Sequence, residues 1–182
     1  MRVIAGRFKG RRLKPPAFEG VRPTSDKLRE TLFNIVAPRI EGARVLDGYA
    51  GTGAVGIEAL SRGAAHVTFV ERDRRAAALI AANLALCGAV QGYTIEQGDV
   101  TAVLQRAPEG RAFDLVLLDP PYDADPDTVT AALEAAAGRM GDDGLLVLER
   151  ARGREPDAPA QLQRVRDVAS GDSALSFFTR RG

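Results

Sequence analysis

The amino-acid sequence predicts an α/β protein with a mainly parallel sheet, and three observations carry this prediction. Short apolar runs rich in Val, Leu and Ile alternate with longer amphipathic stretches, at the spacing of repeated β-α-β units. The last two strand-like runs have only Ser170 to Ser173 between them, which is hairpin spacing. The length of 182 residues suits one domain, at roughly 150 residues per domain. We expect helices on both faces of the sheet and an antiparallel pair at one sheet edge.

Seven strands are expected, because seven short runs of mainly apolar residues are bounded by glycine or charged residues. They span residues 44–47, 67–71, 93–96, 113–119, 145–149, 163–169 and 174–180. Helices are expected between the first five strands, at residues 54–62, 73–87, 101–106 and 127–138. Another helix is expected before the first strand, where Thr24-Ser25-Asp26 can cap a helix that runs to about Val36 and ends before Pro38. The sheet is therefore predicted to be seven-stranded.

The N-terminal end is strongly basic. Residues 1–30 carry nine basic and three acidic side chains, although the net charge of the whole chain is only +1. Residues 1–14 alternate weakly and predict a small β-hairpin around Lys9-Gly10, which Pro15-Pro16 separates from the rest. We therefore divide the chain into a basic N-terminal arm at residues 1–20 and a main domain at residues 21–182. Charge concentrated in this way favours an anionic partner such as nucleic acid, and a merely solubilising arm is the alternative.

Several classes of protein are excluded by composition. The single Cys87 rules out a disulfide framework and a cysteine-based zinc cluster, and the single His66 argues against a histidine-ligated metal. Both side chains are expected to be structural. No apolar run approaches the roughly 20 residues of a membrane span, and the first ten residues lack the apolar core of a signal peptide. We expect a soluble, cytoplasmic monomer with no metal and no membrane partner.

A glycine-rich loop follows the first strand of the main domain. Gly51, Gly53 and Gly56 match the spacing G-x-G-x-x-G, and Glu71 follows about 20 residues after Gly51. Glycines let the backbone approach a bound nucleotide, and the start of the next helix offers free N–H groups. An acid at the end of the second strand can accept both ribose hydroxyls. This segment predicts a nucleoside cofactor, and by itself it leaves a nicotinamide enzyme open.

Two acids favour a cationic cofactor over a dinucleotide. Asp47 places a carboxylate at the mouth of the loop, where it would repel a pyrophosphate and attract the amine and sulfonium of S-adenosylmethionine. Asp99 follows the third strand, where it can accept a hydrogen bond from an adenine amino group. An N-cap for the next helix is an equally good explanation of Asp99.

A second motif, Asp119-Pro120-Pro121-Tyr122, directly follows the apolar fourth strand. Ligands of open α/β sheets bind outside the carboxyl ends of the strands, so this motif should face the glycine loop. The Asp119 carboxylate and the Pro120 carbonyl form a pair of acceptors that suits an exocyclic amine, and Tyr122 offers a ring on which a base can stack. A rigid turn with Tyr122 covering the core is the structural alternative.

These motifs together resemble the class I S-adenosylmethionine-dependent methyltransferases that methylate amines, and they imply a Rossmann-like fold. Four further segments narrow the resemblance to the RsmD family, and they are Arg2 to Arg11 (RVIAGRFKGR), Arg22 to Asp26 (RPTSD), Arg29 to Asn34 (RETLFN) and Gly56 to Ala64 (GIEALSRGA). The resemblance covers residues 1 to about 150. It implies methylation of the N2 amine of one guanine in 16S ribosomal RNA, in an assembling or assembled small ribosomal subunit.

The resemblance also implies roles for the cofactor-binding and catalytic residues, whereas the basic charge of the arm indicates the RNA-binding residues. Cofactor binding is expected at Asp47, Tyr49, Ala50, Gly51, Gly53, Glu71, Arg72, Asp99 and Val100, with the 47–53 loop on the methionine part, Glu71 on the ribose and Asp99-Val100 on the adenine. Catalysis is expected at Asp119, Pro120, Pro121 and Tyr122. RNA binding is expected at Arg7, Lys9, Arg11, Arg12 and Arg22. Family members often have Leu-Phe where this chain has Gly48-Tyr49, so the role of Tyr49 stays open.

Three alternatives remain at this point. The same motif suits another amine of a nucleic acid, in DNA adenine or tRNA guanine. An NAD-type oxidoreductase would use the same glycines, and a non-catalytic RNA-binding protein would keep the basic arm without methyl transfer. Whether Asp119 also takes the proton from the amine is left open.

Overall fold

The computed structural model describes residues 1–18, 25–108, 110 and 112–182. These residues build one seven-stranded sheet with the strand order β3-β2-β1-β4-β5-β7-β6. The strands are β1 Arg44–Gly48, β2 His66–Glu71, β3 Tyr93–Gln97, β4 Phe113–Leu118, β5 Met140–Ala151, β6 Leu162–Ser170 and β7 Ser173–Arg180. Strands β1 to β5 pair in parallel, whereas β7 is antiparallel to β5 and β6. The predicted sheet and its C-terminal antiparallel hairpin are confirmed.

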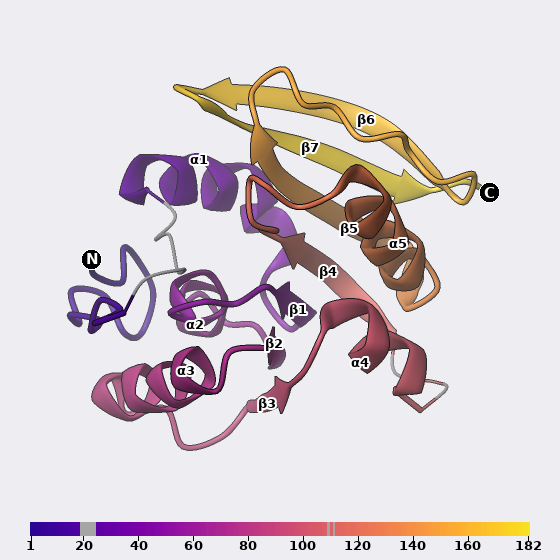
Figure 1. The fold of residues 1–182 in the computed structure, drawn as a ribbon. Helices are drawn as coiled ribbons and strands as arrows, with labels where there is room; N and C mark the ends of the chain where they lie inside the picture. Colours follow the sequence, from indigo (N-terminus) through magenta and orange to yellow (C-terminus); the bar gives the residue numbers. More distant parts are fainter. Residues whose placement is uncertain (19–24, 109, 111) are drawn as a thin grey trace.

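Helices cover both faces of this sheet (Figure 1). In the described part of the chain they are α1 Asp26–Val36, α2 Ala54–Ser61, α3 Arg74–Cys87, α4 Val100–Arg106 and α5 Pro126–Ala137, with a short 3₁₀ helix η1 at Ala37–Arg39. Helices α1, α2 and α3 lie on one face, and α4 and α5 lie on the other. Within the described ranges, no helix is long and apolar enough to cross a membrane.

Side-chain alternation along the strands gives each face its own core. In β4, Leu115 and Leu117 are buried under α1, α2 and α3, whereas Val116 and Leu118 are buried under α4 and α5. Successive residues of a strand point to opposite faces, so a strand covered on both sides reads as a continuous apolar run. This explains why the central strands were visible in the sequence.

Side-chain caps define where four of the helices begin. Ser25 accepts a hydrogen bond from the Leu28 N–H of α1, which confirms the predicted cap. Asp73, Asp99 and Asp125 cap α3, α4 and α5 in the same way. The predicted helix and strand positions hold to within one or two residues, apart from β5. That strand begins at Met140 instead of 145, because the polar residues 141–144 pair irregularly beside Phe113.

The N-terminal arm is a folded-back loop that lies beside α2 and α3 (Figure 1). Its antiparallel pairing consists of one isolated bridge between Arg2 and Arg12. The Val3 N–H donates to the Arg11 carbonyl, and the Gly10 N–H donates to the Val3 carbonyl. Residues 1–18 contain no regular strand, so the hairpin predicted here is reduced to that bridge. Val3, Phe8 and Leu13 are buried in the core under α1, α2 and α3.

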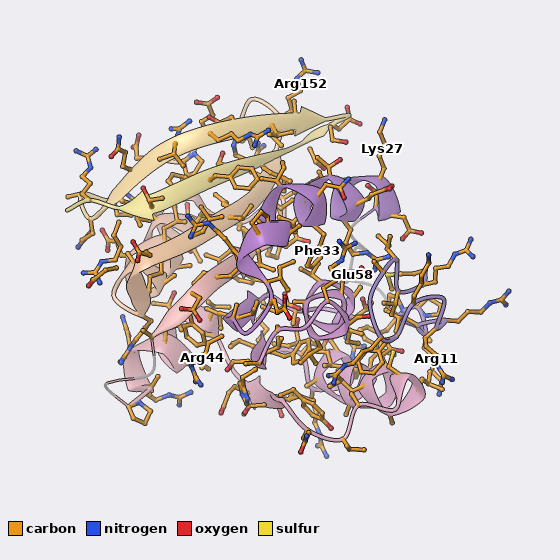
Figure 2. The ribbon with its side chains drawn as sticks, turned by 180° about the vertical axis from the view of Figure 1, so that it is seen from behind. Arg11, Lys27, Phe33, Arg44, Glu58 and Arg152 are labelled. Carbon is orange, nitrogen blue, oxygen red and sulfur yellow. The ribbon has the colours of Figure 1, made fainter. Side chains whose placement is uncertain are left out.

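Helix α2 holds the backbone of the arm. The Glu58 side chain is fully buried between α1 and α2, and its carboxylate accepts hydrogen bonds from the Ile4 and Ala5 N–H groups at 2.7 and 2.9 Å (Figure 2). Arg62 donates to the same carboxylate at 2.8 Å. The Ser61 hydroxyl accepts from the Phe8 N–H, and the Ser61 carbonyl accepts from the Arg7 N–H. The arm is therefore a fixed part of the fold.

Close approach of the arm to α2 requires glycine at position 6. Gly6 has φ +81°, and a Cβ atom there would lie 1.9 Å from the Ser61 carbonyl oxygen. The arm is also joined to α1, because the buried Arg29 donates to the Arg2 carbonyl at 2.6 Å and to the Asp26 carboxylate at 3.0 Å. Arg29 and Glu58 thus place opposite charges under the same loop.

A Glu58→Gln variant tests this anchoring. An amide has one acceptor oxygen, so the variant turns its NH₂ group toward donors of the arm and leaves buried N–H groups unpaired. Each unpaired buried group costs about 1–3 kcal/mol, and loss of the charge opposite Arg62 adds to that. We expect the free energy of unfolding, measured by urea denaturation, to fall by about 2–5 kcal/mol. The exposed Glu96→Gln variant is the control, and equal stability of the two variants would contradict the assignment.

Candidate active site

A cleft of about 910 Å³ opens at the carboxyl ends of the parallel strands. This volume lies within the range of roughly 300–1,000 Å³ that small-molecule sites occupy. Most of the predicted cofactor-binding and catalytic residues line this cleft. These residues are Tyr49, Gly51, Glu71, Arg72, Asp99, Val100, Asp119, Pro120, Pro121 and Tyr122. Asp47, Ala50 and Gly53 are buried and do not line the cleft.

The glycine-rich loop has an unusual backbone that brings main-chain atoms to the cleft. Gly51 and Gly53 have φ +54° and +77°, and Gly53 is the N-cap of α2. Tyr49 has φ +62°, which makes it the one non-glycine residue with positive φ among those described. Gly56 serves packing instead, because a Cβ atom there would lie 2.3 Å from the Phe69 ring. The three glycines of the motif therefore have different roles.

Asp47 lies beneath this loop at the end of β1. Its side chain is only 3% exposed, and its Oδ2 atom accepts a hydrogen bond from the Gly56 N–H at 2.8 Å. Burial raises the pKa of Asp47 to about 8, the Gly56 hydrogen bond opposes this shift, and the nearby Asp119 and Glu71 carboxylates add to it. Asp47 is therefore mainly protonated below about pH 8, and a cation bound nearby would favour its ionised form.

Glu71 joins the loops that follow three neighbouring strands. Its two carboxylate oxygens accept hydrogen bonds from Gly51 N–H at 2.9 Å and from Asp73 N–H at 2.8 Å. Its carbonyl accepts from Gly98 N–H at 3.0 Å. A carboxylate has about four lone-pair positions, so two more hydroxyl donors can be accommodated. The geometry suits the two hydroxyls of a ribose.

Asp99 and Val100 form the wall nearest to Glu71. Asp99 is the N-cap of α4, with its Oδ1 atom accepting from Ala102 N–H at 3.0 Å, as the alternative interpretation predicts. The side chain is nevertheless exposed in the cleft, and its second oxygen has no part in the cap. Val100 is buried and gives the wall an apolar base. This combination suits the ring and the amino group of adenine.

Tyr49 packs against the core under α4 and α5 and also lines the cleft. Burial raises the pKa of Tyr49 to about 12, with a further contribution from the Asp99 carboxylate. Its hydroxyl has no hydrogen-bond partner within the described part of the chain. Tyr49 therefore contributes an apolar surface beside Asp99.

The Asp119-Pro120-Pro121-Tyr122 segment lies across the cleft from Glu71. The Asp119 N–H donates to the Gly48 carbonyl at 3.3 Å, which ties this segment to β1. The Pro121 carbonyl accepts from Ala124 N–H at 2.9 Å in a turn. The Tyr122 hydroxyl shares a hydrogen bond with the Ser173 hydroxyl at the start of β7, and Arg154 donates to the Tyr122 carbonyl at 3.2 Å. Tyr122 is thus held both at its side-chain hydroxyl and at its backbone carbonyl.

Besides residues within three positions of the predicted ones, such as Asp73, Arg75 and Asp123, three parts of the cleft wall were missed in the sequence. They are Ser25 and Lys27 at the start of α1, Glu149 near the end of β5, and the β6–β7 turn at residues 170–173. Glu149 carries a signal that could have revealed it, because acids also stand at or just after the ends of β1, β2, β3 and β4. The other two parts are brought in only by tertiary packing.

Four of the five predicted RNA-binding residues lie outside the cleft. Arg7, Lys9, Arg11 and Arg12 are exposed on the arm, and Arg22 falls outside the described residues. The Arg7 guanidinium lies over the Phe8 ring, 4.5 Å from its centroid. In Figure 2, Arg11 on the arm and Lys27 on α1 both project outward on the same side of the molecule.

A family model and named relatives match most or nearly all of the chain. The family model described as "Conserved hypothetical protein 95" matches residues 1–179. Ribosomal RNA small subunit methyltransferase D from Escherichia coli (strain K12) is 35% identical over 181 residues, which are 99% of this chain and 90% of that protein. The protein of the same name from Haemophilus influenzae is 43% identical over 125 residues, 67% of this chain and 64% of that protein.

Solved structures agree in fold. The structure of yhhF from Escherichia coli has a TM-score of 0.84 and 34% identity, with 99% of this chain and 97% of that chain covered. The structure of a hypothetical protein from Thermus thermophilus has a TM-score of 0.82 and 30% identity, with 97% and 98% covered. These likenesses and the strand order confirm the Rossmann-like class I methyltransferase fold. The chain therefore belongs to the RsmD family, the family of ribosomal RNA small subunit methyltransferase D.

Proposed function

We propose that this protein transfers a methyl group from S-adenosylmethionine to the N2 amine of a guanine in 16S ribosomal RNA. The observation that carries the proposal is one cleft in which an acidic nucleoside-binding end, at Glu71 and Asp99, faces the acceptors of Asp119 and Pro120. The names of the relatives, which specify small-subunit ribosomal RNA and methyl transfer, support the substrate class. We propose that the enzyme acts in the cytoplasm, as a monomer, on an assembling or assembled subunit.

The cleft residues fit the cofactor. Glu71 retains acceptor capacity for the ribose, Asp99 and Val100 suit the adenine, and the buried Asp47 favours a cation near the 47–53 loop. A dinucleotide fits less well, because its pyrophosphate would lie above Asp47 and close to two further carboxylates. When bound, S-adenosylmethionine supplies a methyl group that is already activated on its sulfonium sulfur.

Positioning is the main task left to the protein. The lone pair of guanine N2 is delocalised into the ring, so the amine is a weak nucleophile. Holding two reactants in line can supply roughly 7–11 kcal/mol of the barrier. The Asp119 carboxylate and the Pro120 carbonyl accept the amine N–H groups, orient N2 and stabilise the positive charge that develops on it. The proton that N2 loses goes to water or to Asp119.

Methyl transfer is tested with tritiated S-adenosylmethionine and small ribosomal subunits that lack the modification. Digestion of the RNA to nucleosides should yield labelled N2-methylguanosine. Label on a ring nitrogen, on adenine, or only on DNA or tRNA would contradict the proposed substrate. Thermal stabilisation by NAD(H) but not by S-adenosylhomocysteine would favour the oxidoreductase, and RNA binding without label would favour a non-catalytic protein.

An Asp119→Ala variant separates chemistry from cofactor binding. We expect kcat to fall by about 100-fold or more, because one preorganised acceptor in the transition state is commonly worth about 10²–10³ in kcat. Calorimetric affinity for S-adenosylmethionine should stay within a few-fold of that of the parent protein. The exposed Asp127→Ala variant is the control. Parental kcat in Asp119→Ala would remove this residue from the catalytic assignment.

An Asp47→Asn variant should change how stability depends on pH. Because the pKa of Asp47 is raised to about 8, the folded protein keeps a proton there from about pH 4 to about pH 8 that the unfolded chain has lost. The contribution of Asp47 to the free energy of unfolding is thus present in full below about pH 4. It is lost as the pH rises toward 8. Asparagine stays neutral, so the stability of the variant relative to the parent should rise over this window.

Urea denaturation at pH 5, 6.5 and 8 measures this difference, with Asp127→Asn as the matched control. The same variant should bind S-adenosylmethionine more weakly at pH 8 than the parent does, because it lacks the negative charge that the ionised Asp47 places beneath the 47–53 loop. A stability difference that is the same at pH 5 and pH 8 would show that Asp47 does not titrate in this window.

Replacing Arg7, Lys9, Arg11 and Arg12 together by Gln tests the arm. Each phosphate contact contributes roughly 0.7–0.9 to the slope of log K against log salt, so the slope for RNA binding should flatten by about 2–4. Cofactor affinity should not change, because these side chains lie outside the cleft. A variant with Arg39, Arg106 and Arg181 replaced is the control. If both variants keep the parental slope of log K against log salt, the arm does not bind RNA phosphates.

A further inference from the structure

Glu149 of β5 lies beside Asp119 at the edge of the sheet. Strands β4 and β5 pair in parallel with Leu117 opposite Val147 and Leu118 opposite Leu148. The next residue of each chain segment is an acid, Asp119 after β4 and Glu149 within β5. Paired strands lie about 4.8 Å apart, so the two backbones are neighbours at this position. The register of β4 and β5 therefore brings Asp119 and Glu149 side by side at this edge of the sheet.

Both side chains point to the same side. Leu117 and Val147 belong to the core under α1, α2 and α3, and alternation turns the residues two positions later toward that face. Glu149 is 9% exposed, and Glu149 and Asp119 both line the cleft. Ser173, which holds the Tyr122 hydroxyl, pairs with Ala151 two residues further along β5. Asp119, Tyr122 and Glu149 thus surround one corner of the cleft.

Two carboxylates at this corner match one base edge. Guanine presents the N1–H and the N2 amine side by side, so its edge offers adjacent donors that carboxylates can accept. Adenine and cytosine present a ring-nitrogen lone pair next to their amine, and a second carboxylate would repel that lone pair. Asp119 and the Pro120 carbonyl account for holding an amine, but they do not select the base that carries it.

We propose that Glu149 determines base specificity by accepting the N1–H of the target guanine while Asp119 holds the N2 amine. This inference rests on the proposed function and adds the selection of guanine. Glu149 acts on the substrate base, so cofactor affinity is independent of it. The corner formed by β4, β5 and the β6–β7 turn is then the base-reading part of the cleft.

The test compares guanine with 2-aminopurine at the methylated position of a small-subunit RNA joined from a transcript and a synthetic segment. 2-Aminopurine keeps the N2 amine but has a lone pair on N1. The parent enzyme should prefer guanine in kcat/KM by at least about 10-fold. A Glu149→Gln variant should lose about 10- to 100-fold on guanine, because a neutral amide oxygen accepts the N1–H more weakly than a carboxylate does. Its NH₂ can donate to N1 of 2-aminopurine, so the preference should shrink or reverse.

Glu155→Gln is the matched control, since Glu155 is an exposed acid that pairs with Arg150 and Arg164 outside the cleft lining. It should keep the parental preference. Cofactor affinity of Glu149→Gln should equal that of the parent. An unchanged preference in Glu149→Gln, or an equal loss on both bases, would overturn the specificity role while leaving the proposed function intact. Failure of the parent enzyme to methylate guanine N2 would overturn both.

Discussion

Parallel pairing of β1, β2 and β4 forces several carboxylates to the same edge of the sheet. Asp47, Glu71 and Asp119 lie close enough that the two other carboxylates help burial to raise the pKa of Asp47. Backbone N–H groups offset part of this repulsion, with Gly56 donating to Asp47 and both Gly51 and Asp73 donating to Glu71. The residual negative potential suits a sulfonium cofactor and a substrate that offers an amine. The edge is therefore less stable without its ligands, which is common at functional sites.

Helix α2 connects the glycine-rich loop with the basic arm. Its first turn lies under the glycine-rich loop, where Gly56 approaches Asp47 and the Phe69 ring. Two residues later, the Glu58 carboxylate accepts the Ile4 and Ala5 N–H groups of the arm. A helix of eight residues thus sets the position of the glycine-rich loop and of the basic arm together. Because the arm backbone is anchored in this way, its cationic side chains are presented from a fixed base beside α1.

Much of this arrangement could be predicted from the sequence because the determining patterns are local. Buried parallel strands read as apolar runs, Ser25 marks the start of α1, and glycines mark the loop that needs positive φ. The polar start of β5 has no such pattern, since its pairing is imposed by β4. Glu149 and the β6–β7 turn reach the cleft through strand register and tertiary packing. The anchoring of the arm by Glu58 was likewise invisible, because the partners are 53 or 54 residues apart.

A structure of the protein with S-adenosylhomocysteine, determined by crystallography, tests the central claim most directly. We expect ribose hydroxyls within hydrogen-bond distance of the Glu71 carboxylate, the adenine between Val100 and Asp99, and the sulfur turned toward Asp119 and Pro120. Binding with the sulfur directed away from Asp119, or with the ribose distant from Glu71, would contradict this claim. Either result would show that the carboxylates at this edge of the sheet do not bind and orient the cofactor as proposed.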